Sequence, residues 1–309
     1  MNPCLYGLLV KMAARGLGTV RIGHPPYARK IACDISCVGG QTPQGIISEV
    51  FLPDINATIT LSMEGSSYYK RLELRPRHTR HASRSFLGTT NLNSDVPMPY
   101  YNWPWTQFMD APPKLSTKLL WSYNYIQIPP PPFHSTAPKA LFLAKNCNSD
   151  NGRENVARTL QRYGVPLDSP GPCITTGYSF DPSDLVDKNA LMRKYRVYFA
   201  FENQNTNDYV TEKLWGAYAS GTIPVYYGAP NIRSLIPPES AILVQTFPTL
   251  KAAAQEINAA LTSPSVNARY HRWRFKPLPL AFVKTWNFTH VHSECRLCRF
   301  VSQQLELLK

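Results

Sequence analysis

From residue 139 onward the chain alternates short apolar segments with amphipathic ones, and this alternation is the strongest constraint on its fold. Buried strands are predicted at 140–144, 197–201, 223–227 and 241–244. Helices are predicted at 153–163, 209–220 and 249–261, with Gly164 and Gly221 ending the first two. Strands and helices in this order predict right-handed crossovers and a parallel sheet that is covered on both faces.

The remainder of the chain suggests a second, sheet-containing domain. Segments 46–52 and 57–63 are rich in β-branched residues and predict strands. A run of four prolines starting at Pro129 is typical of a semi-rigid extended linker. We therefore predict an irregular or processed segment at 1–30, a first domain at 31–128, a linker at 129–138, a second domain at 139–285 and a C-terminal segment at 286–309.

The charge balance favours an anionic partner. The 33 Lys and Arg residues against 20 Asp and Glu give a net charge of +13. Nucleic acid, a phosphorylated substrate and a membrane surface are all compatible with this charge. The densest basic stretch runs from Arg75 to Arg84 and has no interleaved aromatic residues to stack bases, which argues against nucleic acid. A solvated loop, or contact with an anionic substrate or membrane, stays open for that stretch.

One strand-to-helix junction, at 201–213, has the character of a ligand site. Ligands of a parallel sheet bind at the carboxyl ends of its strands, where helix N-termini offer free N–H groups. Turn chemistry with Asp208 as helix N-cap would explain the polar loop but not Lys213, because a lysine in the first turn opposes the helix dipole unless it faces an anion. A pyrophosphate bound at the helix start would make the position of Lys213 favourable. Glu212 suits a sugar hydroxyl because a carboxylate accepts hydrogen bonds.

The residues of this junction and several others carry a resemblance. The strings are Phe201-Glu202-Asn203, Asp208-Tyr209-Val210-Thr211-Glu212-Lys213-Leu214, Gly221-Thr222-Ile223-Pro224-Val225 and Gly228-Ala229-Pro230-Asn231. Together they resemble the donor-binding signature of the family 10 α-1,3-fucosyltransferases. The plant type that acts on the N-glycan core is most similar, with counterparts of Ser62-Met63-Glu64, Ser94-Asp95-Val96-Pro97, Asn146-Cys147 and the string 291–298. The resemblance runs from about 31 to 301 and is strong from 139.

This resemblance implies a GT-B architecture, α/β in class, with two Rossmann-like domains facing across a cleft. The second domain would mainly hold GDP-fucose and the first the acceptor glycan. The implied reaction is inverting: L-fucose moves from GDP-β-L-fucose to a GlcNAc hydroxyl of a glycoprotein N-glycan in α-1,3 linkage. Relatives of this type are usually type II membrane proteins of the Golgi lumen, so we expect that location, with an anchor that this sequence does not contain.

The resemblance also assigns roles to individual residues. Glu64 matches the position of the general base, although Gly65 replaces the usual Ser after it. Arg153 and Lys213 match the contacts to the diphosphate. Asn203, Tyr209 and Glu212 match the other donor contacts, and core packing is the alternative role for Tyr209.

No metal site is expected from the sequence. An Asp-x-Asp motif, the metal-diphosphate chelate of the GT-A transferases, does not occur in the chain. Protein cations would take the role of the metal, so no cofactor is required. A divalent cation such as Mn²⁺ or Mg²⁺ could still stimulate turnover by screening the nucleotide.

Seven cysteines and two glycosylation sequons bear on the compartment. The resemblance implies a Cys295–Cys298 disulfide, with Cys147–Cys173 as a second bridge and Cys33–Cys37 as a third, and leaves Cys4 over. Disulfides require an oxidising compartment. Asn56 and Asn287 begin the two sequons. The string from His290 to Cys298 can also be interpreted as a zinc site, because it offers two histidines and a C-x-x-C pair.

Other functions stay open beside the fucosyltransferase. The nearest are another GT-B nucleotide-sugar transferase, an inactive member of the family, and a non-catalytic sugar-binding protein with the same fold. A basic nucleic-acid-binding protein with a zinc-bound tail is the alternative from a different class, although we expect no nucleic-acid partner.

Overall fold

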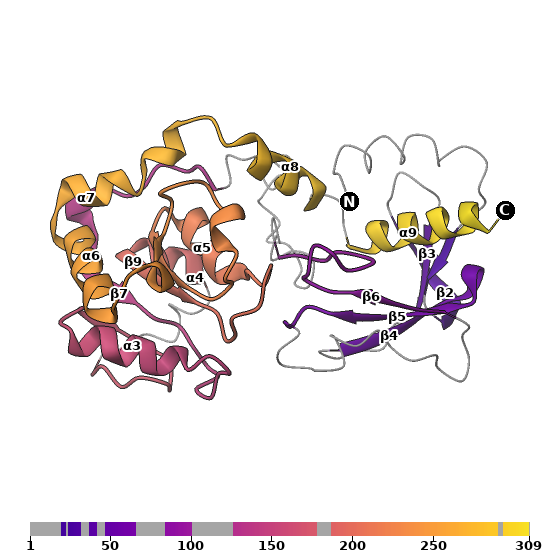
Figure 1. Cartoon of the computed structure of the whole chain (residues 1–309), viewed down its shortest axis with the longest axis horizontal. Helices are drawn as coiled ribbons and strands as arrows, with labels where there is room; N and C mark the ends of the chain where they lie inside the picture. Colours follow the sequence, from indigo (N-terminus) through magenta and orange to yellow (C-terminus); the bar gives the residue numbers. More distant parts are fainter. Residues whose placement is uncertain are drawn as a thin grey trace. The chain divides into compact units, whose positions relative to one another are not determined.

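The computed structural model describes residues 20–22, 24–31, 37–41, 47–65, 84–100, 126–177, 187–289 and 293–308. The chain divides into two compact units, Met1–Tyr100 with Lys284–Lys309 and Tyr101–Val283 (Figure 1). The second unit includes the Pro-rich stretch 129–138 that the sequence assigns to a linker. Each unit has its own apolar core.

The second unit is built on a parallel sheet, as predicted, with β8 as a fifth strand that the sequence did not predict. The strand order is β11-β10-β9-β7-β8. The strands are β7 (Ala137–Leu141), β8 (Leu167–Asp168), β9 (Tyr195–Phe201), β10 (Ile223–Tyr227) and β11 (Ile242–Leu243). Because β8 lies on one side of β7 and the later strands lie on the other, the chain changes direction between β7 and β9. In doubly wound sheets, ligands bind beside such a switch point at the carboxyl ends of the strands.

Helices cover both faces of this sheet. They are α3 (Arg153–Arg162), α4 (Lys188–Arg193), α5 (Glu212–Ser220), α6 (Leu250–Thr262) and α7 (Pro264–Arg269), followed by α8 (Leu280–Thr289). Val197, Phe199 and Phe201 alternate along β9 and bury their side chains in one core with α3 and α6, while α4 and α5 pack on the other face (Figure 1). The alternation of apolar residues therefore predicted the layers correctly.

Two predicted elements begin three residues away from their expected starts, the largest such shifts in the second unit. The strand expected at 140–144 is β7 at Ala137–Leu141, because its pairing with β9 already starts at Ala137. The helix expected from 209 begins at Glu212, and its N-cap is Thr211 and not Asp208. Asp208 adopts a left-handed conformation, with φ at 64°, which a helix start does not accept. The end of α5 at Gly221 is as predicted.

The first unit contains two three-stranded sheets and the C-terminal helix. Their order is β1-β3-β2 and β4-β5-β6. The elements are β1 (Val20–Ile22), β2 (His24–Ile31), β3 (Cys37–Gln41), β4 (Ile47–Leu52), β5 (Ala57–Ser62), β6 (Arg84–Gly88) and α9 (Ser293–Leu307). Strands β1 and β2 lie mostly in the segment that was predicted to be irregular, and β1 is held by pairing with β3 and by the burial of Val20.

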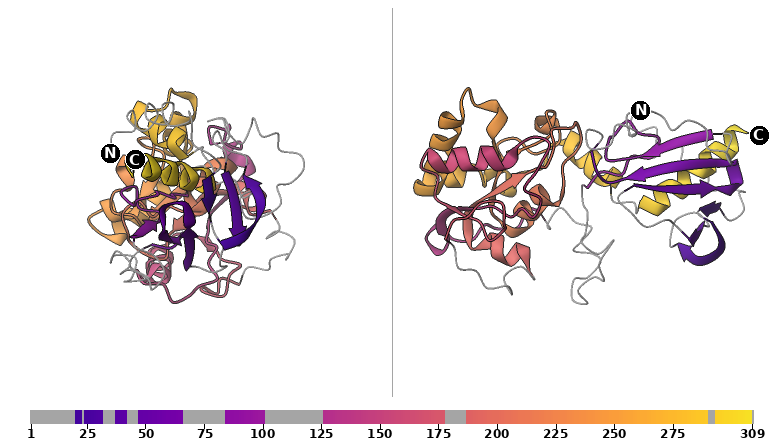
Figure 2. Two further views of the ribbon diagram at one scale, coloured as in Figure 1. Left: turned by 90° about the vertical axis from the view of Figure 1, so that its right-hand side faces the viewer. Right: turned by 90° about the horizontal axis from the view of Figure 1, so that it is seen from below.

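Helix α9 closes the core of the first unit. It lies along the β4-β5-β6 sheet, and Phe300 meets Phe86 of β6 edge to face at 4.8 Å between ring centroids (Figure 2). The C-terminal segment thus contributes apolar side chains to a sheet more than 200 residues earlier in the chain. None of the helices that the structure describes is both long and apolar enough to span a membrane.

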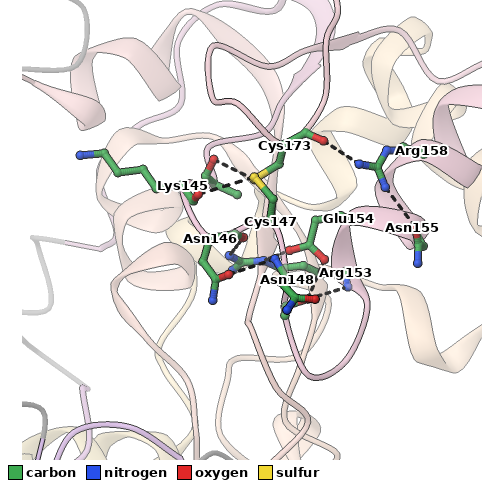
Figure 3. Close-up of a disulfide and its surroundings, with 11 residues drawn as sticks. Lys145, Asn146, Cys147, Asn148, Arg153, Glu154, Asn155, Arg158 and Cys173 are labelled. Atoms are coloured by element: carbon green, nitrogen blue, oxygen red, sulfur yellow. Dashed lines mark hydrogen bonds and ion pairs between the residues drawn. A yellow bond between two sulfur atoms is a disulfide. The ribbon is translucent and has the colours of Figure 1, made fainter.

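Cys147 and Cys173 form a disulfide that ties the loop after β7 to the segment after β8 (Figure 3). Cys295 and Cys298, both on α9, are disulfide-bonded as well. Among the described residues, however, these two cysteines are not bonded to each other. The predicted Cys295–Cys298 pairing is therefore not supported, and Cys4, Cys33 and the side chain of Cys37 lie outside the description.

The zinc interpretation of the C-terminal tail is contradicted. Zinc binds cysteine as a thiolate, and Cys295 and Cys298 are held in disulfides. His290 and His292 lie outside the described residues. The nucleic-acid-binding alternative that depended on a zinc-bound tail loses its main support with these two ligands.

A buried arginine, Arg274, binds residues that precede the prolines to the rest of the second unit. Arg274 is 4% exposed, and its NH1 donates to the carbonyls of Ile126 at 2.6 Å and Tyr218 at 2.8 Å. Its Nε donates to Nδ1 of His271 at 3.3 Å. Burial, with the charge of Arg274 added, lowers the pKa of His271 to about 3.

This histidine predicts an acid-sensitive stability. A folded-state pKa below the unfolded value means that the stabilisation is present above about pH 6.5 and is lost as the pH falls towards 3. Within that window, His271 should lower the free energy of unfolding by about 1.4 kcal/mol for each unit by which the pH falls. His271→Asn keeps an acceptor for Arg274 and should flatten the slope in urea unfolding at pH 4–7. His134→Asn, at an exposed histidine, is the control, and equal slopes for wild type and His271→Asn would contradict the prediction.

The disulfide near the end of β7 predicts a second stability effect. The bond joins residues 26 positions apart, so removing it frees a loop of that length in the unfolded chain. Cys147→Ser/Cys173→Ser should lower the free energy of unfolding by about 2–4 kcal/mol, measured by guanidinium titration. Cys295 and Cys298 are present in both proteins, and an unchanged midpoint would contradict a stabilising role.

Candidate functional site

The candidate site lies where β7 and β9 diverge. Two loops leave the sheet at this edge, 142–152 after β7 and 202–211 after β9, and each leads into the N-terminus of a helix. Helix N-termini carry unpaired N–H groups and a positive partial charge. All five residues predicted to contact the donor come from these two loops and helix starts: Arg153, Asn203, Tyr209, Glu212 and Lys213. The structure therefore brings them to one edge of the sheet.

Arg153 joins the two strand ends. It is 3% exposed, and its NH1 donates to the carbonyl of Phe201 at 2.9 Å while NH2 donates to the carbonyl of Asn146 at 3.1 Å (Figure 3). Its Nε pairs with Glu154 at 3.2 Å. In this structure the guanidinium satisfies backbone carbonyls of the sheet edge, and its predicted contact with a diphosphate stays a prediction.

Lys213 lies in the first turn of α5, within a set of acidic and hydroxyl groups. Its Nζ donates to Oγ1 of Thr211 at 2.8 Å and to Oε1 of Glu212 at 3.2 Å. Oε2 of Glu202 lies 3.5 Å away. The side chain of Lys213 as a whole is 19% exposed.

The neighbouring carboxylates keep Lys213 charged. Burial disfavours the ammonium, but Glu212 and Glu202 outweigh it and raise the pKa of Lys213 above its usual value. Burial is the largest influence on Glu212 and opposes its charge, yet the Lys213 ammonium and the hydrogen bonds to the carboxylate together outweigh it and lower the pKa of Glu212. For Glu202, which is completely buried, burial dominates and raises the pKa. The edge therefore presents a permanent cation beside an ionised carboxylate.

Asn203 offers an unused acceptor at the same edge. Its Oδ1 is buried and has no hydrogen-bond partner among the described residues. An unpaired buried acceptor is costly unless a ligand hydroxyl or a water molecule reaches it. Tyr209, in contrast, is 2% exposed, and its carbonyl accepts from the hydroxyl of Tyr226 at 3.3 Å. That burial is compatible with the packing role considered for Tyr209.

Polar side chains connect the three strand ends around this edge. Asn151 donates to the carbonyl of Glu202 at 3.0 Å and to Oδ1 of Asn205 at 2.9 Å. The hydroxyl of Tyr227, at the end of β10, donates to the carbonyl of Asn151 at 3.2 Å. These contacts fix the loops after β7, β9 and β10 relative to one another.

Glu64, the predicted base, belongs to the first unit. It follows β5 and is half-buried, and its backbone N–H donates to Oγ of Ser62 at 3.2 Å. Asn56 is exposed before β5, where a glycan would be accessible. The side chain of Asn287 and most of the basic stretch between Arg75 and Arg84 lie outside the described residues.

Two residues of the edge, Glu202 and Thr211, stand in the shared strings but were given no role by the sequence analysis. Glu202 ends a run of apolar strand residues, and Thr211 precedes the helix start. A charged residue directly after a buried strand, and a threonine before the first helical turn, are the signals that could have found them. No group of three or more His, Cys, Asp or Glu side chains in the described ranges could hold a metal ion.

The arrangement can bind an anion and a hydroxyl-bearing ligand at once. A charged lysine at a helix N-terminus is suited to phosphate groups. An ionised Glu212 and the free Oδ1 of Asn203 are acceptors for hydroxyl groups, as in a sugar or ribose. A nucleotide sugar combines both kinds of group.

Comparisons with known proteins agree with this chemistry. The C-terminal model of glycosyltransferase family 10 (fucosyltransferase) matches residues 134–308. A fucosyltransferase-like protein from Arabidopsis thaliana is 28% identical over 278 residues, which cover 88% of this chain and 49% of the relative. GDP-fucose protein O-fucosyltransferase 3 from Gallus gallus is 31% identical over 143 residues, 44% of this chain and 30% of the relative. The chain thus spans about half or less of the length of these curated relatives.

A crystal structure of an α1,3-fucosyltransferase shares the fold. Its TM-score is 0.50 at 20% sequence identity, and the match covers 77% of this chain and 72% of the other. Together with the parallel sheet, this match confirms the predicted α/β, GT-B class. The family model extends over more than half of the residues, and this chain therefore belongs to glycosyltransferase family 10, the fucosyltransferases.

Proposed function

We propose that this protein transfers L-fucose from GDP-β-L-fucose to a GlcNAc hydroxyl of a glycoprotein N-glycan, in α-1,3 linkage and with inversion at the fucose C1 atom. The observation that carries the proposal is the position of Lys213, a charged lysine in the first turn of α5 at the switch point of the sheet. Membership of family 10 and the strings shared with plant-type enzymes support the sugar and the linkage.

The donor would bind with its diphosphate at the N-terminus of α5. The Lys213 ammonium would keep its contact with Thr211 and exchange its contact with Glu212 for phosphate oxygens, and it would stabilise the charge on departing GDP. Arg153 would assist from α3. Glu212 and Oδ1 of Asn203 would accept from hydroxyl groups of the donor. The name of the Gallus gallus relative, a GDP-fucose enzyme, supports this donor.

The transfer would be a direct displacement. The acceptor oxygen forms a bond to C1 of fucose while the bond from C1 to the β-phosphate oxygen breaks, and its electron pair leaves with GDP. Glu64 would take the proton of the acceptor hydroxyl as general base. Protein cations fill the role of a metal in this scheme, so Mn²⁺ or Mg²⁺ would at most stimulate turnover.

A second acceptor class follows from one of the relatives. GDP-fucose protein O-fucosyltransferase 3 is named for transfer to protein hydroxyls. A serine or threonine hydroxyl of a polypeptide is therefore the alternative acceptor for the same donor site. We also propose the Golgi lumen as the location, supported by the disulfides of the structure, because such bonds persist in oxidising compartments.

The donor site predicts a strong dependence on Lys213. GDP release from GDP-fucose should depend on an acceptor, and Lys213→Ala should lower kcat/KM by about 10²-fold or more, because the cation meets charge that grows in the transition state. The assay compares truncated N-glycans with an unglycosylated protein acceptor. Lys139→Ala removes a lysine of the same sheet that pairs with Asp168, and it is the matched control. Equal rates for the Lys213 and Lys139 variants would exclude the proposed donor site.

The base assignment predicts a separation of binding from turnover. Glu64→Gln should lower kcat by about 10²-fold or more while the dissociation constant of GDP stays near the wild-type value. Glu49→Gln, an exposed glutamate of β4 in the same unit, is the control. Turnover retained by Glu64→Gln would remove Glu64 from the mechanism, and GDP binding without turnover in the wild type would indicate an inactive member of the family.

A further inference from the structure

We infer that Glu202, a carboxylate without solvent exposure at the end of β9, is a positioning residue that acts through Thr211 to hold the Lys213 ammonium at the anion-binding edge. This inference rests on the proposed function for its consequence in turnover. The contacts that carry it belong to the strand end and the first turn of α5.

The hydrogen bonds give the Glu202–Thr211 pair a fixed direction. Thr211 donates to Glu202 twice, from its backbone N–H at 2.7 Å and from its Oγ1 hydroxyl at 2.7 Å. In its ionised form Glu202 accepts only, so the proton of the Thr211 hydroxyl points to Glu202. The lone pairs of Oγ1 are then turned to Lys213, whose Nζ donates at 2.8 Å. Glu202 thus determines that Thr211 presents an acceptor to the lysine.

The same carboxylate fixes the start of the helix. Thr211 is the N-cap of α5, and its N–H group is bound to Glu202 and not to solvent. The backbone N–H of Glu202 in turn donates to the carbonyl of Tyr227 at 2.8 Å. The first turn of α5 is therefore anchored through one side chain to the ends of β9 and β10.

The neighbouring loop is shaped to admit this carboxylate. A Cβ atom at Gly228 would lie 2.6 Å from Cγ of Glu202 and 2.6 Å from the Tyr226 hydroxyl, closer than side-chain atoms approach. The side chain of Gln245 holds Gly228 from the other side, with Nε2 donating to its carbonyl at 2.6 Å. The space for Glu202 depends on a residue without a side chain.

The charged groups around Lys213 define what removal of Glu202 would change. Glu212 faces the ammonium from α5, Glu202 and Tyr198 face it from β9, and Arg153 acts on it from α3. Glu202 and Glu212 favour the charged lysine, whereas burial and Arg153 oppose it. Without the charge of Glu202, Lys213 loses one of its two carboxylate neighbours and becomes easier to deprotonate.

The test compares three substitutions with a matched control. Glu202→Gln removes the charge at nearly constant shape. Thr211→Val removes the bridging hydroxyl, and Thr211→Ser keeps it. Asp168→Asn is the control, because Asp168 is also a buried carboxylate that accepts from a lysine, Lys139, at 3.1 Å and from Tyr195 at 3.1 Å, away from this edge.

Two measurements report on the lysine. Calorimetry gives the dissociation constants of GDP and of guanosine, which has no phosphates. Glu202→Gln and Thr211→Val should raise the dissociation constant of GDP by about tenfold or more and leave that of guanosine unchanged. Thr211→Ser and Asp168→Asn should keep both constants within about threefold of the wild-type values. Mass spectrometry of Lys213 labelled by an amine-reactive ester, over a range of pH, should show faster labelling in Glu202→Gln than in Asp168→Asn.

Each outcome supports or overturns the inference. The expected pattern is a loss specific to GDP, rescued by Thr211→Ser, with faster Lys213 labelling. If Glu202→Gln and Asp168→Asn have the same Lys213 labelling rate and the same GDP affinity, the inference about Glu202 is overturned, even if Lys213→Ala shows that the donor site is correct. If the wild type binds no GDP, the proposed donor site fails, and the labelling rates alone decide whether Glu202 holds the lysine.

Discussion

A parallel sheet leaves backbone carbonyls and N–H groups without partners where its strands diverge, and in this protein the buried guanidinium of Arg153 bridges that gap. It donates to two carbonyls, one after β7 and one at the end of β9, and so sets the distance between the two loops. Asn151 continues this connection to the loop after β9. The helix starts that carry the candidate donor contacts depend on those loops having one arrangement.

The basic residues of this protein therefore have two separate roles, a proposed one in ligand binding and one in the fold. A net charge of +13 suggested an anionic partner, and Lys213 at the start of α5 fits such a role. Arg153 and Arg274, however, are buried and donate to backbone carbonyls. Part of the excess of arginine is thus structural, because a guanidinium can satisfy several carbonyls that a loop-rich fold leaves unpaired. Net charge alone does not separate these roles.

The sequence predicted the second unit well because its information is local. Apolar residues with the right period define β9, β10, α3 and α6, and glycine ends α5 where expected. The predicted start of α5 was wrong because Asp208 takes a left-handed conformation that is fixed by a reciprocal pair with Asn231. Glu202 was missed for a related reason: its partners are Thr211 and Lys213, and their approach depends on how the intervening loop folds.

Long-range contacts of this kind also decide which part of the chain can exist alone. Arg274 binds the carbonyl of Ile126, 148 residues earlier, and that of Tyr218 near the end of α5. Gln127 adds a bond to the carbonyl of Lys276 at 3.0 Å. A fragment that starts after the prolines would leave the buried guanidinium of Arg274 without the Ile126 carbonyl, and one that stops before η9 (Arg272–Phe275) would leave the Tyr218 carbonyl without Arg274. A fragment that keeps α5 and these contacts must therefore begin no later than Ile126 and extend through Lys276.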